Sequence, residues 1–393
     1  MNLKDTLNQE YLIDRSNIVS DFLNKFGVNV KQENDLYLFK YNQISARWDE
    51  EITKECRGII LRFKNEWEVV SRPFNKFFNY GESHCGIVNK ESFSSDEMKQ
   101  YSAMEKADGT CIQLWFDDIQ NKWRASTLGL ITPANVQDQN FTFSDLFFKL
   151  FCSEPKYLDK EYTFIFELCA TDNRIITKYK RDHLKLLGIR HTKTGEHISA
   201  LSWARYALFP HDIVQIPKWY DLHYLNISNI NQLNDWVENE SLKYDVYGEW
   251  PEGFVLYKDA IPIAKFKNQK YINLHAVGGG DIGHSKNKII DAIFLEHIDD
   301  IYNVLTNSLK EFCDNVKNQY SNLLIAQNKI LDQINNMNFD SKKDFALWIN
   351  SNVESRIRPY FFQNADNLIK NNKTNVSFDE WMKSHYLKFD WKK

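Results

Sequence analysis

The sequence lacks the features that mark secreted, zinc-binding and membrane-spanning proteins. Its six cysteines form no Cys-x-x-Cys pair, and no histidine cluster stands near them at zinc-binding spacing. No apolar run reaches the roughly 18 residues of a membrane span, and no apolar signal core follows Met1. These absences predict a soluble, cytoplasmic protein with reduced, buried thiols and no membrane partner.

The chain also lacks an excess of positive charge. Its formal net charge is −4, and residues 281–393 carry 15 basic and 15 acidic residues. A protein that holds nucleic acid by its overall charge, or by a basic tail, is therefore excluded. Any polyanion must be bound by a local cluster of cations. No internal repeat or low-complexity segment is present.

The chain has enough hydrophobic residues to form more than one hydrophobic core. The 393 residues are 43% hydrophobic and 15% aromatic, which suits two folded domains. Gly278-Gly279-Gly280 interrupts the pattern, and we place a domain boundary there. We expect an α+β domain of antiparallel sheets with flanking helices over residues 1–277, and an all-helical domain over residues 281–393.

Hydrophobic periodicity places the elements of both domains. Strands are predicted where residues alternate or form short apolar runs, at 56–63, 67–74, 111–116, 123–129, 162–169, 184–190, 254–258 and 263–267. Residues 1–45 are expected to be helical at first and then loosely extended. A long amphipathic stripe runs from Ile289 to Leu309 and resumes at Leu323 after a predicted break. Ser341 is predicted to start a further helix.

The stretch Lys106-Ala107-Asp108-Gly109 carries the most chemistry. A lysine amine becomes a nucleophile once it loses its proton, and nearby positive charge or a dry pocket lowers its pKa enough for that. The aspartate and glycine would hold the loop that presents the lysine. The alternative is a solvated hairpin turn, because Asp-Gly is a favoured turn pair.

Other charged residues lie inside or beside apolar strands. Glu167 interrupts an apolar run, and a buried carboxylate needs a cation, metal or hydroxyl partner. Lys265 and Lys267 are two apart, so they share a strand face, where a phosphate between them would relieve their repulsion. An edge strand guarded by lysines is the alternative. Three cations also surround the hairpin at 56–74: Arg57, Arg72 and Lys76.

Taken in order, these pieces resemble the motifs of the covalent nucleotidyltransferases, the superfamily of polynucleotide ligases and mRNA capping enzymes. The matching segments are Lys106-Ala107-Asp108-Gly109, Phe166-Glu167, Leu186-Leu187-Gly188-Ile189-Arg190, Glu252-Gly253-Phe254-Val255 and Lys265-Phe266-Lys267. A finer match, over roughly residues 50–275, is to the ATP-dependent tRNA-repair RNA ligases of T-even bacteriophages, the RNA ligase 1 type. It rests on Glu55-Cys56-Arg57-Gly58-Ile59, Ser71-Arg72-Pro73, Lys76-Phe77-Phe78-Asn79 and Asn173-Arg174-Ile175.

The resemblance implies a reaction and a set of roles. Lys106 would attack the α-phosphate of ATP and form a lysyl-AMP, while Lys265 and Lys267 hold that phosphate. Glu167 and Glu252 would serve the ribose and Mg²⁺ or Mn²⁺. The remaining nucleotide contacts would come from Arg57, Lys76, Phe78, Glu105 and Gly109. AMP would then pass to an RNA 5′-phosphate, and a 3′-hydroxyl would displace it.

The resemblance also implies partners and a setting. It points to RNA with 3′-hydroxyl and 5′-phosphate ends, including nicked tRNA, bound by a monomer in a bacterial or phage-infected cell. The helical tail would select the RNA. Two further hypotheses stay open: a capping or adenylylating enzyme that does not seal ends, and a nucleic-acid-binding module with a dead nucleotide site.

One position departs from the resemblance. The family usually has a basic residue just before the glycine of this strand, the one predicted at 123–129, where this chain has Thr127-Leu128-Gly129. Leucine cannot contact phosphate. Arg124 lies on the same strand face by period two, so we consider it as the substitute.

Overall fold

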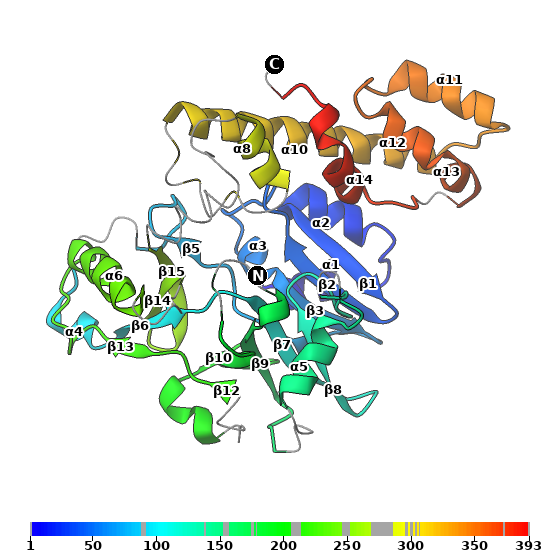
Figure 1. The fold of residues 1–393 in the computed structure, drawn as a ribbon. Coiled ribbons are helices and arrows are strands. Elements are labelled where there is room, and N and C mark those ends of the chain that lie inside the picture. Colours follow the sequence, from blue (N-terminus) through cyan, green and yellow to red (C-terminus); the bar gives the residue numbers. More distant parts are fainter. Residues whose placement is uncertain are drawn as a thin grey trace. The chain divides into compact units, whose positions relative to one another are not determined.

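The computed structural model describes residues 2–87, 92–136, 139–151, 157–173, 177, 179–205, 214–245, 252–268, 286–294, 298, 302, 305, 307–371 and 374–391. The chain forms two compact units, Met1–Asn42 with Ala46–His275, and Gln43–Ser45 with Ala276–Lys393 (Figure 1). Gly278-Gly279-Gly280, where the sequence placed a boundary, lies outside the described residues, as do Arg174 and Ile175.

The first sheet of unit 1 is antiparallel, in the order β1-β2-β3-β4. Its elements in chain order are α1 (Leu3–Glu10), α2 (Ile18–Phe26), β1 (Val28–Glu33), β2 (Leu36–Tyr41), α3 (Glu51–Glu55), β3 (Arg57–Phe63) and β4 (Trp67–Ser71). The two helices bury Leu7 and Phe22 against Phe39 and Trp67 of the sheet. The predicted hairpin of β3 and β4 is confirmed. The segment expected to be loosely extended is instead the paired hairpin of β1 and β2.

The second sheet has the order β11-β10-β9-β7-β8, with β12 beside β10. Its strands are β7 (Thr110–Asp117), β8 (Lys122–Thr127), β9 (Tyr162–Cys169), β10 (His183–His191), β11 (His197–Ile198) and β12 (Val214–Gln215). Two 3₁₀ turns lie between them, η1 (Thr171–Asn173) and η2 (Ala200–Arg205). Helix α5 (Phe143–Phe151) buries three of its residues, Leu146, Phe147 and Phe151, in the core of this sheet.

The third sheet has the order β13-β6-β14-β15-β5. Its strands are β5 (Phe78–Asn79), β6 (Tyr101–Lys106), β13 (Trp219–Asp221), β14 (Gly253–Lys258) and β15 (Ile261–Lys267). Helices α4 (Ser95–Met98) and α6 (Ile230–Asp245) belong to the same region, and α6 contributes Leu233 and Val237 to its core. The sheets are mostly antiparallel, as the sequence predicted. Two pairings, β5 with β15 and β10 with β12, are parallel.

The regular elements in the described part of unit 2 are all helices. It contains α8 (Lys286–Phe294), α10 (Asn307–Asn335), α11 (Lys342–Asn352), α12 (Arg358–Gln363), α13 (Ala365–Asn371), α14 (Phe378–His385) and the 3₁₀ turn η5 (Tyr386–Lys388). The break predicted between Leu309 and Leu323 is wrong, because α10 is continuous and has no glycine or proline to interrupt it. Ser341 caps α11 as predicted, accepting from the Asp344 amide. No described helix is long and apolar enough to cross a membrane.

Candidate active site

The site forms where β6 leaves the third sheet and the chain enters the second. Lys106 ends β6, and Gly253 of β14 lies opposite both Lys106 and Lys267 of β15. The Glu252 amide donates to the Lys106 carbonyl at 3.0 Å, just before β14 begins. Three neighbouring strands therefore bring Lys106, Glu252 and Lys267 to one level of the sheet.

Glu252 bridges the two lysines. One of its carboxylate oxygens accepts from Lys106 Nζ, and the other lies 2.6 Å from Lys267 Nζ. Burial alone would raise the pKa of Glu252, but the two ammonium groups lower it to about 2. Glu252 is therefore ionised at neutral pH, with both oxygens engaged.

Glu167 approaches the same place from the second sheet. It lies on β9 opposite Cys111 of β7 and Lys185 of β10. Burial raises the pKa of Glu167 to about 7; Lys106 opposes this shift, and Glu252 adds to it. The sequence analysis expected this carboxylate, inside an apolar strand, to need a partner. Its raised pKa gives a physical reason for that expectation. Glu167 changes charge near neutral pH, where a bound cation would favour its ionised form.

The raised pKa of Glu167 predicts a pH-dependent stability. The unfolded chain binds the proton with the ordinary pKa of 4.5 and the folded chain with a pKa of about 7. The stabilisation is therefore complete below pH 4.5 and is lost as pH rises through about 7. Between pH 5 and 8, without metal or nucleotide, the wild type should lose up to about 3 kcal/mol of unfolding free energy relative to Glu167→Gln. Denaturant titrations at four pH values measure this difference.

A Glu252→Gln protein serves as the control for that experiment. Glu252 has a pKa of about 2 and does not titrate in the range tested. Because the Glu252 charge contributes only part of the raised pKa of Glu167, the stability difference between wild type and Glu252→Gln should change less with pH than the difference for Glu167→Gln. A difference for Glu167→Gln that does not change with pH would contradict the assignment.

Beside this carboxylate centre lies a group of cations around Phe77. The Arg57 guanidinium carbon and Lys265 Nζ lie 5.1 Å and 5.2 Å from the centre of the Phe77 ring. Within the described residues Arg57 Nη1 is buried without a hydrogen-bond partner, and no carboxylate pairs with Lys265. Burial lowers the pKa of Lys265 well below its usual value, and Lys76 and Arg57 lower it further. The Arg57 guanidinium and the Lys265 amine thus form a buried concentration of positive charge, which favours an anion as its ligand.

Lys265 and Lys267 therefore differ, although they share a strand. Lys267 is paired with Glu252, whereas Lys265 lies near Arg57 and Lys76. Lys76 Nζ lies 5.0 to 5.3 Å from three ring centres, those of Tyr41, Trp48 and Phe78. Phe78 itself is buried in the core of the third sheet. It contributes a wall beside Lys76.

The loop after Lys106 is held by β9 and by residues that lie between β9 and β10. Asp108 accepts from the Thr177 amide at 2.6 Å, and its own amide donates to the Tyr179 hydroxyl at 3.0 Å. Gly109 runs so close to β9 that a Cβ there would stand 2.4 Å from the Leu168 carbonyl oxygen. Only glycine fits this approach, so the predicted turn residues fix the position of Lys106 instead of lying in solvent.

Glu105 has a partner that the sequence analysis missed. Lys185 of β10 donates to one oxygen of Glu105 at 2.7 Å, and the Lys218 amide donates to the other at 3.3 Å. Both side chains of the ion pair are almost buried. A lysine inside the apolar run of residues 183–191 was the available signal, of the same kind that identified Glu167.

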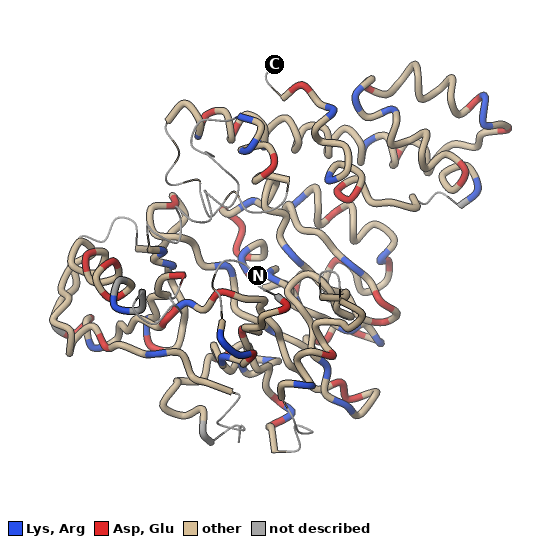
Figure 2. Tube along the Cα trace, viewed as in Figure 1, with Lys and Arg blue, Asp and Glu red and all other residues tan. Residues whose placement is uncertain are grey.

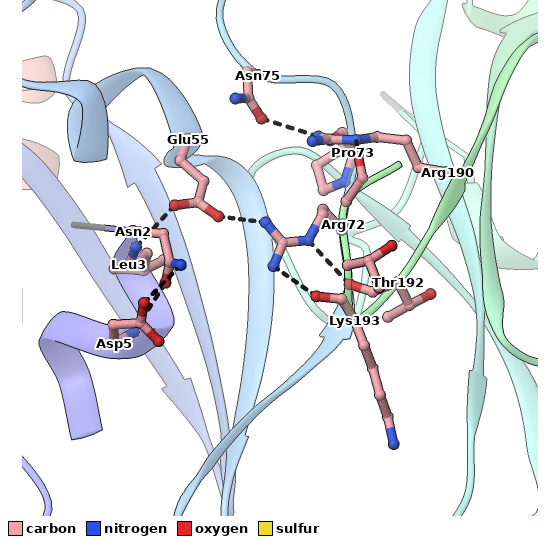
Figure 3. A network of polar contacts seen from close by, with 12 residues as sticks. Asn2, Leu3, Asp5, Glu55, Arg72, Pro73, Asn75, Arg190, Thr192 and Lys193 are labelled. Carbon is pink, nitrogen blue, oxygen red and sulfur yellow. Dashed lines mark hydrogen bonds and ion pairs between the residues drawn. The ribbon is translucent and has the colours of Figure 1, made fainter. Parts of the chain in front are cut away.

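Arg72 belongs to a separate network of polar contacts. Figure 3 shows Arg72 between Glu55 and Thr192: it pairs with the Glu55 carboxylate and donates to the Thr192 carbonyl at 2.9 Å. Glu55 also accepts from the Leu3 amide of α1 at 2.8 Å. Arg190 donates to the Pro73 carbonyl and to Asn75 in the same region. These arginines join the first sheet to the second.

Arg124 does not replace the basic residue missing at Leu128. Its guanidinium reaches Asp117 at 3.4 Å and Thr132 at 3.2 Å. It lies opposite Trp115, whereas Lys106 precedes the other end of β7, at Thr110. The period-two argument counted Leu128 as part of the strand, but β8 ends at Thr127, and Arg124 lies further back along β8, opposite Trp115.

The carboxylates suit a metal held jointly with phosphates. Within the described ranges, no three His, Cys, Asp or Glu side chains gather to hold an ion by themselves. Mg²⁺ usually takes one or two carboxylates and completes its shell with water and substrate phosphates. Glu167 can supply one such carboxylate ligand. Glu252 can supply the second once Lys106 or Lys267 no longer pairs with it.

A family model described as RNA ligase matches residues 55–271, more than half of the chain. The chain belongs to the RNA ligase family. Every residue that the sequence analysis placed in the site, from Arg57 to Lys267, lies inside the matched segment. The described helices of unit 2 lie outside it. The matched segment therefore contains the carboxylate centre and the cations, and it does not reach the described helices of unit 2.

Two curated relatives show the same likeness. An RNA ligase of Rhodothermus phage RM378 is 32% identical over 217 residues, and a protein of Autographa californica nuclear polyhedrosis virus, provisionally named a bifunctional polynucleotide kinase/RNA ligase, is 30% identical over 279 residues. The matches cover 46% and 65% of this chain but only 48% and 36% of those proteins. A solved archaeal ATP-dependent RNA ligase aligns over 89% of both chains, with 12% identity and a TM-score of 0.42.

Proposed function

We propose that this protein is an ATP-dependent RNA ligase that joins RNA 3′-hydroxyl and 5′-phosphate ends through a lysyl-AMP and an RNA-adenylate. The cations around Phe77 carry the proposal. Burying charged groups without partners is costly, and the cost is offset when a polyanion binds. A nucleoside triphosphate next to Lys106 would supply the negative charge and present a phosphorus atom to the Lys106 amine.

The first step uses the chain's own residues in definite roles. Lys106 must leave Glu252 and lose its proton before its nitrogen bonds to the α-phosphorus of ATP, while the bond from that phosphorus to the pyrophosphate oxygen breaks. Lys265 and Lys267 stabilise the charge that develops on the phosphoryl oxygens. The lowered pKa of Lys265 would return toward its usual value in contact with phosphate.

Glu167 and Glu252 would hold Mg²⁺ or Mn²⁺ together with the nucleotide phosphates. The ion would supply positive charge at the phosphates. Glu105 and Gly109, on either side of Lys106, would shape the nucleotide pocket, and Arg57, Lys76 and Phe78 would lie along the triphosphate.

The RNA steps are assigned by the family likeness. AMP would pass from Lys106 to a 5′-phosphate, and a 3′-hydroxyl would displace AMP and seal the strand, as in the repair of a nicked tRNA. Figure 2 shows basic and acidic residues interspersed along both units, so RNA must be recognised by local groups. The helical unit, which lies outside the matched segment, is our candidate for choosing the RNA.

The proposal is tested by following one phosphate. The protein is mixed with Mg²⁺ and ATP labelled on its α-phosphate, denatured, and examined for label; 5′-phosphorylated RNA is then added to an undenatured sample. We expect label on the protein, its transfer to RNA, and sealed RNA. Label from GTP in place of ATP would indicate a capping enzyme. No label on protein freed of prior AMP would leave only nucleic-acid binding.

A further inference from the structure

Lys40 stands beside the proposed site without belonging to any motif that the sequence analysis identified. It lies on β2 directly opposite Arg57 of β3, at the point where the register of the two strands shifts. Directly opposed residues of an antiparallel pair have side chains on the same face, about 5 Å apart at Cβ. Lys40 is therefore the cross-strand neighbour of the arginine whose Nη1 is buried without a described partner.

The amine of Lys40 reaches the end of β8. A Cβ built on Gly129 would lie 3.8 Å from Lys40 Nζ, so the amine stands next to the backbone there. The same turn crosses β3, because a Cβ on Gly58 would lie 2.6 Å from the Leu128 carbonyl oxygen. The tip of Lys40, the start of β3 and the turn at Leu128-Gly129 thus meet at one point.

This meeting point lies at nearly the same level along the strands of the second sheet as Glu167. Thr127, the last residue of β8, pairs with Ile112, and Cys111, the next residue of β7, pairs with Glu167. Two strand spacings, about 10 Å, separate the end of β8 from β9 at this level, and Leu128 directly follows that end. That distance is within the span of a triphosphate, or of successive RNA phosphates, bound at Lys106.

We propose that Lys40 is a phosphate-binding residue of this site, and that it supplies from β2 the positive charge that Leu128 cannot supply from β8. The inference rests on the proposed function. Lys40 and Arg57 would form a pair of cations at the phosphate-binding end of the site. The phosphate could belong to the outgoing pyrophosphate of ATP or to the RNA strand, and the experiment separates these sources.

The test compares Lys40→Met with Lys31→Met, which removes an exposed lysine from the neighbouring strand β1. Three rates or affinities are measured on the full-length chain. These are lysyl-AMP formation as a function of ATP concentration, sealing of pre-adenylylated RNA without ATP, and calorimetric binding of ATP in the absence of metal. Lys40→Arg and thermal unfolding serve as checks on charge and on folding.

We expect Lys40→Met to lower at least one of these quantities about 10- to 100-fold, as for the loss of one charge-assisted hydrogen bond. Lys40→Arg should recover most of the loss, and Lys31→Met should equal the wild type. A defect in lysyl-AMP formation and ATP binding assigns Lys40 to the triphosphate, and a defect confined to sealing assigns it to RNA. If Lys40→Met equals Lys31→Met in all three, the inference is wrong. A wild type that forms no lysyl-AMP instead contradicts the proposed function, and ATP binding alone then decides the role of Lys40.

Discussion

Replacing Lys106 by alanine should abolish transfer of labelled AMP to the protein, with a loss of at least about 10³-fold in the rate of lysyl-AMP formation. No other described amine occupies its place at the end of β6, between Glu252 and the approach of Glu167. The fold should survive, because Glu252 keeps its ion pair with Lys267. The measurement is gel detection of label from ATP labelled on its α-phosphate.

Lys106→Arg separates the nucleophile from the ion pair. Arginine keeps the positive charge beside Glu252 but does not lose its proton in proteins, so it cannot attack phosphorus. We therefore expect Lys106→Arg to be as inactive as Lys106→Ala. The matched control is Lys99→Ala, which removes an exposed lysine just before β6 and should label normally. Substantial labelling of Lys106→Arg would show that Lys106 acts through its charge and that another residue carries AMP.

Replacing Arg72 by methionine should lower the free energy of unfolding by about 3–5 kcal/mol. The substitution leaves the Glu55 carboxylate buried, with the Leu3 amide as its remaining described donor (Figure 3). It also removes the hydrogen bond from Arg72 to the Thr192 carbonyl, which ties the first sheet to the second. Denaturant unfolding, followed by tryptophan fluorescence, measures the change.

The control for Arg72 is an ion pair on the surface of the same unit. Lys25 pairs with Glu10 at 3.0 Å, and their side chains are 51% and 43% exposed, against 9% and 10% for Arg72 and Glu55. Lys25→Met should cost no more than about 1 kcal/mol. Adding Glu55→Leu to Arg72→Met should recover part of the loss, since it removes the stranded carboxylate. A loss below 1 kcal/mol for Arg72→Met would mean that water reaches Glu55.

Many of the strands, the helices and several candidate site residues could be predicted from the sequence, because each of them depends on a local pattern. Alternating apolar residues identified the strand that follows Lys106, although not β6, which precedes it, and helical spacing identified the tail. A carboxylate inside the apolar run of β9 identified Glu167, since a buried charge requires a reason. Asp108 and Gly109 marked a turn. These signals lie within a few residues of one another, which is the range over which strand and helix geometry acts.

The tertiary structure decided which charges meet. Lys106 and Glu252 are 146 residues apart, and nothing in either segment shows that β6 and β14 are neighbours. The same holds for Glu105 with Lys185, for Arg72 with Glu55, and for Lys40 with Gly129. Lys265 and Lys267 looked equivalent, yet only Lys267 pairs with Glu252. Side-chain partners are set by strand register and burial, which no local pattern encodes. The sequence therefore determined the elements and the residue types of the site, and only the packing of the sheets decided how their charges are balanced.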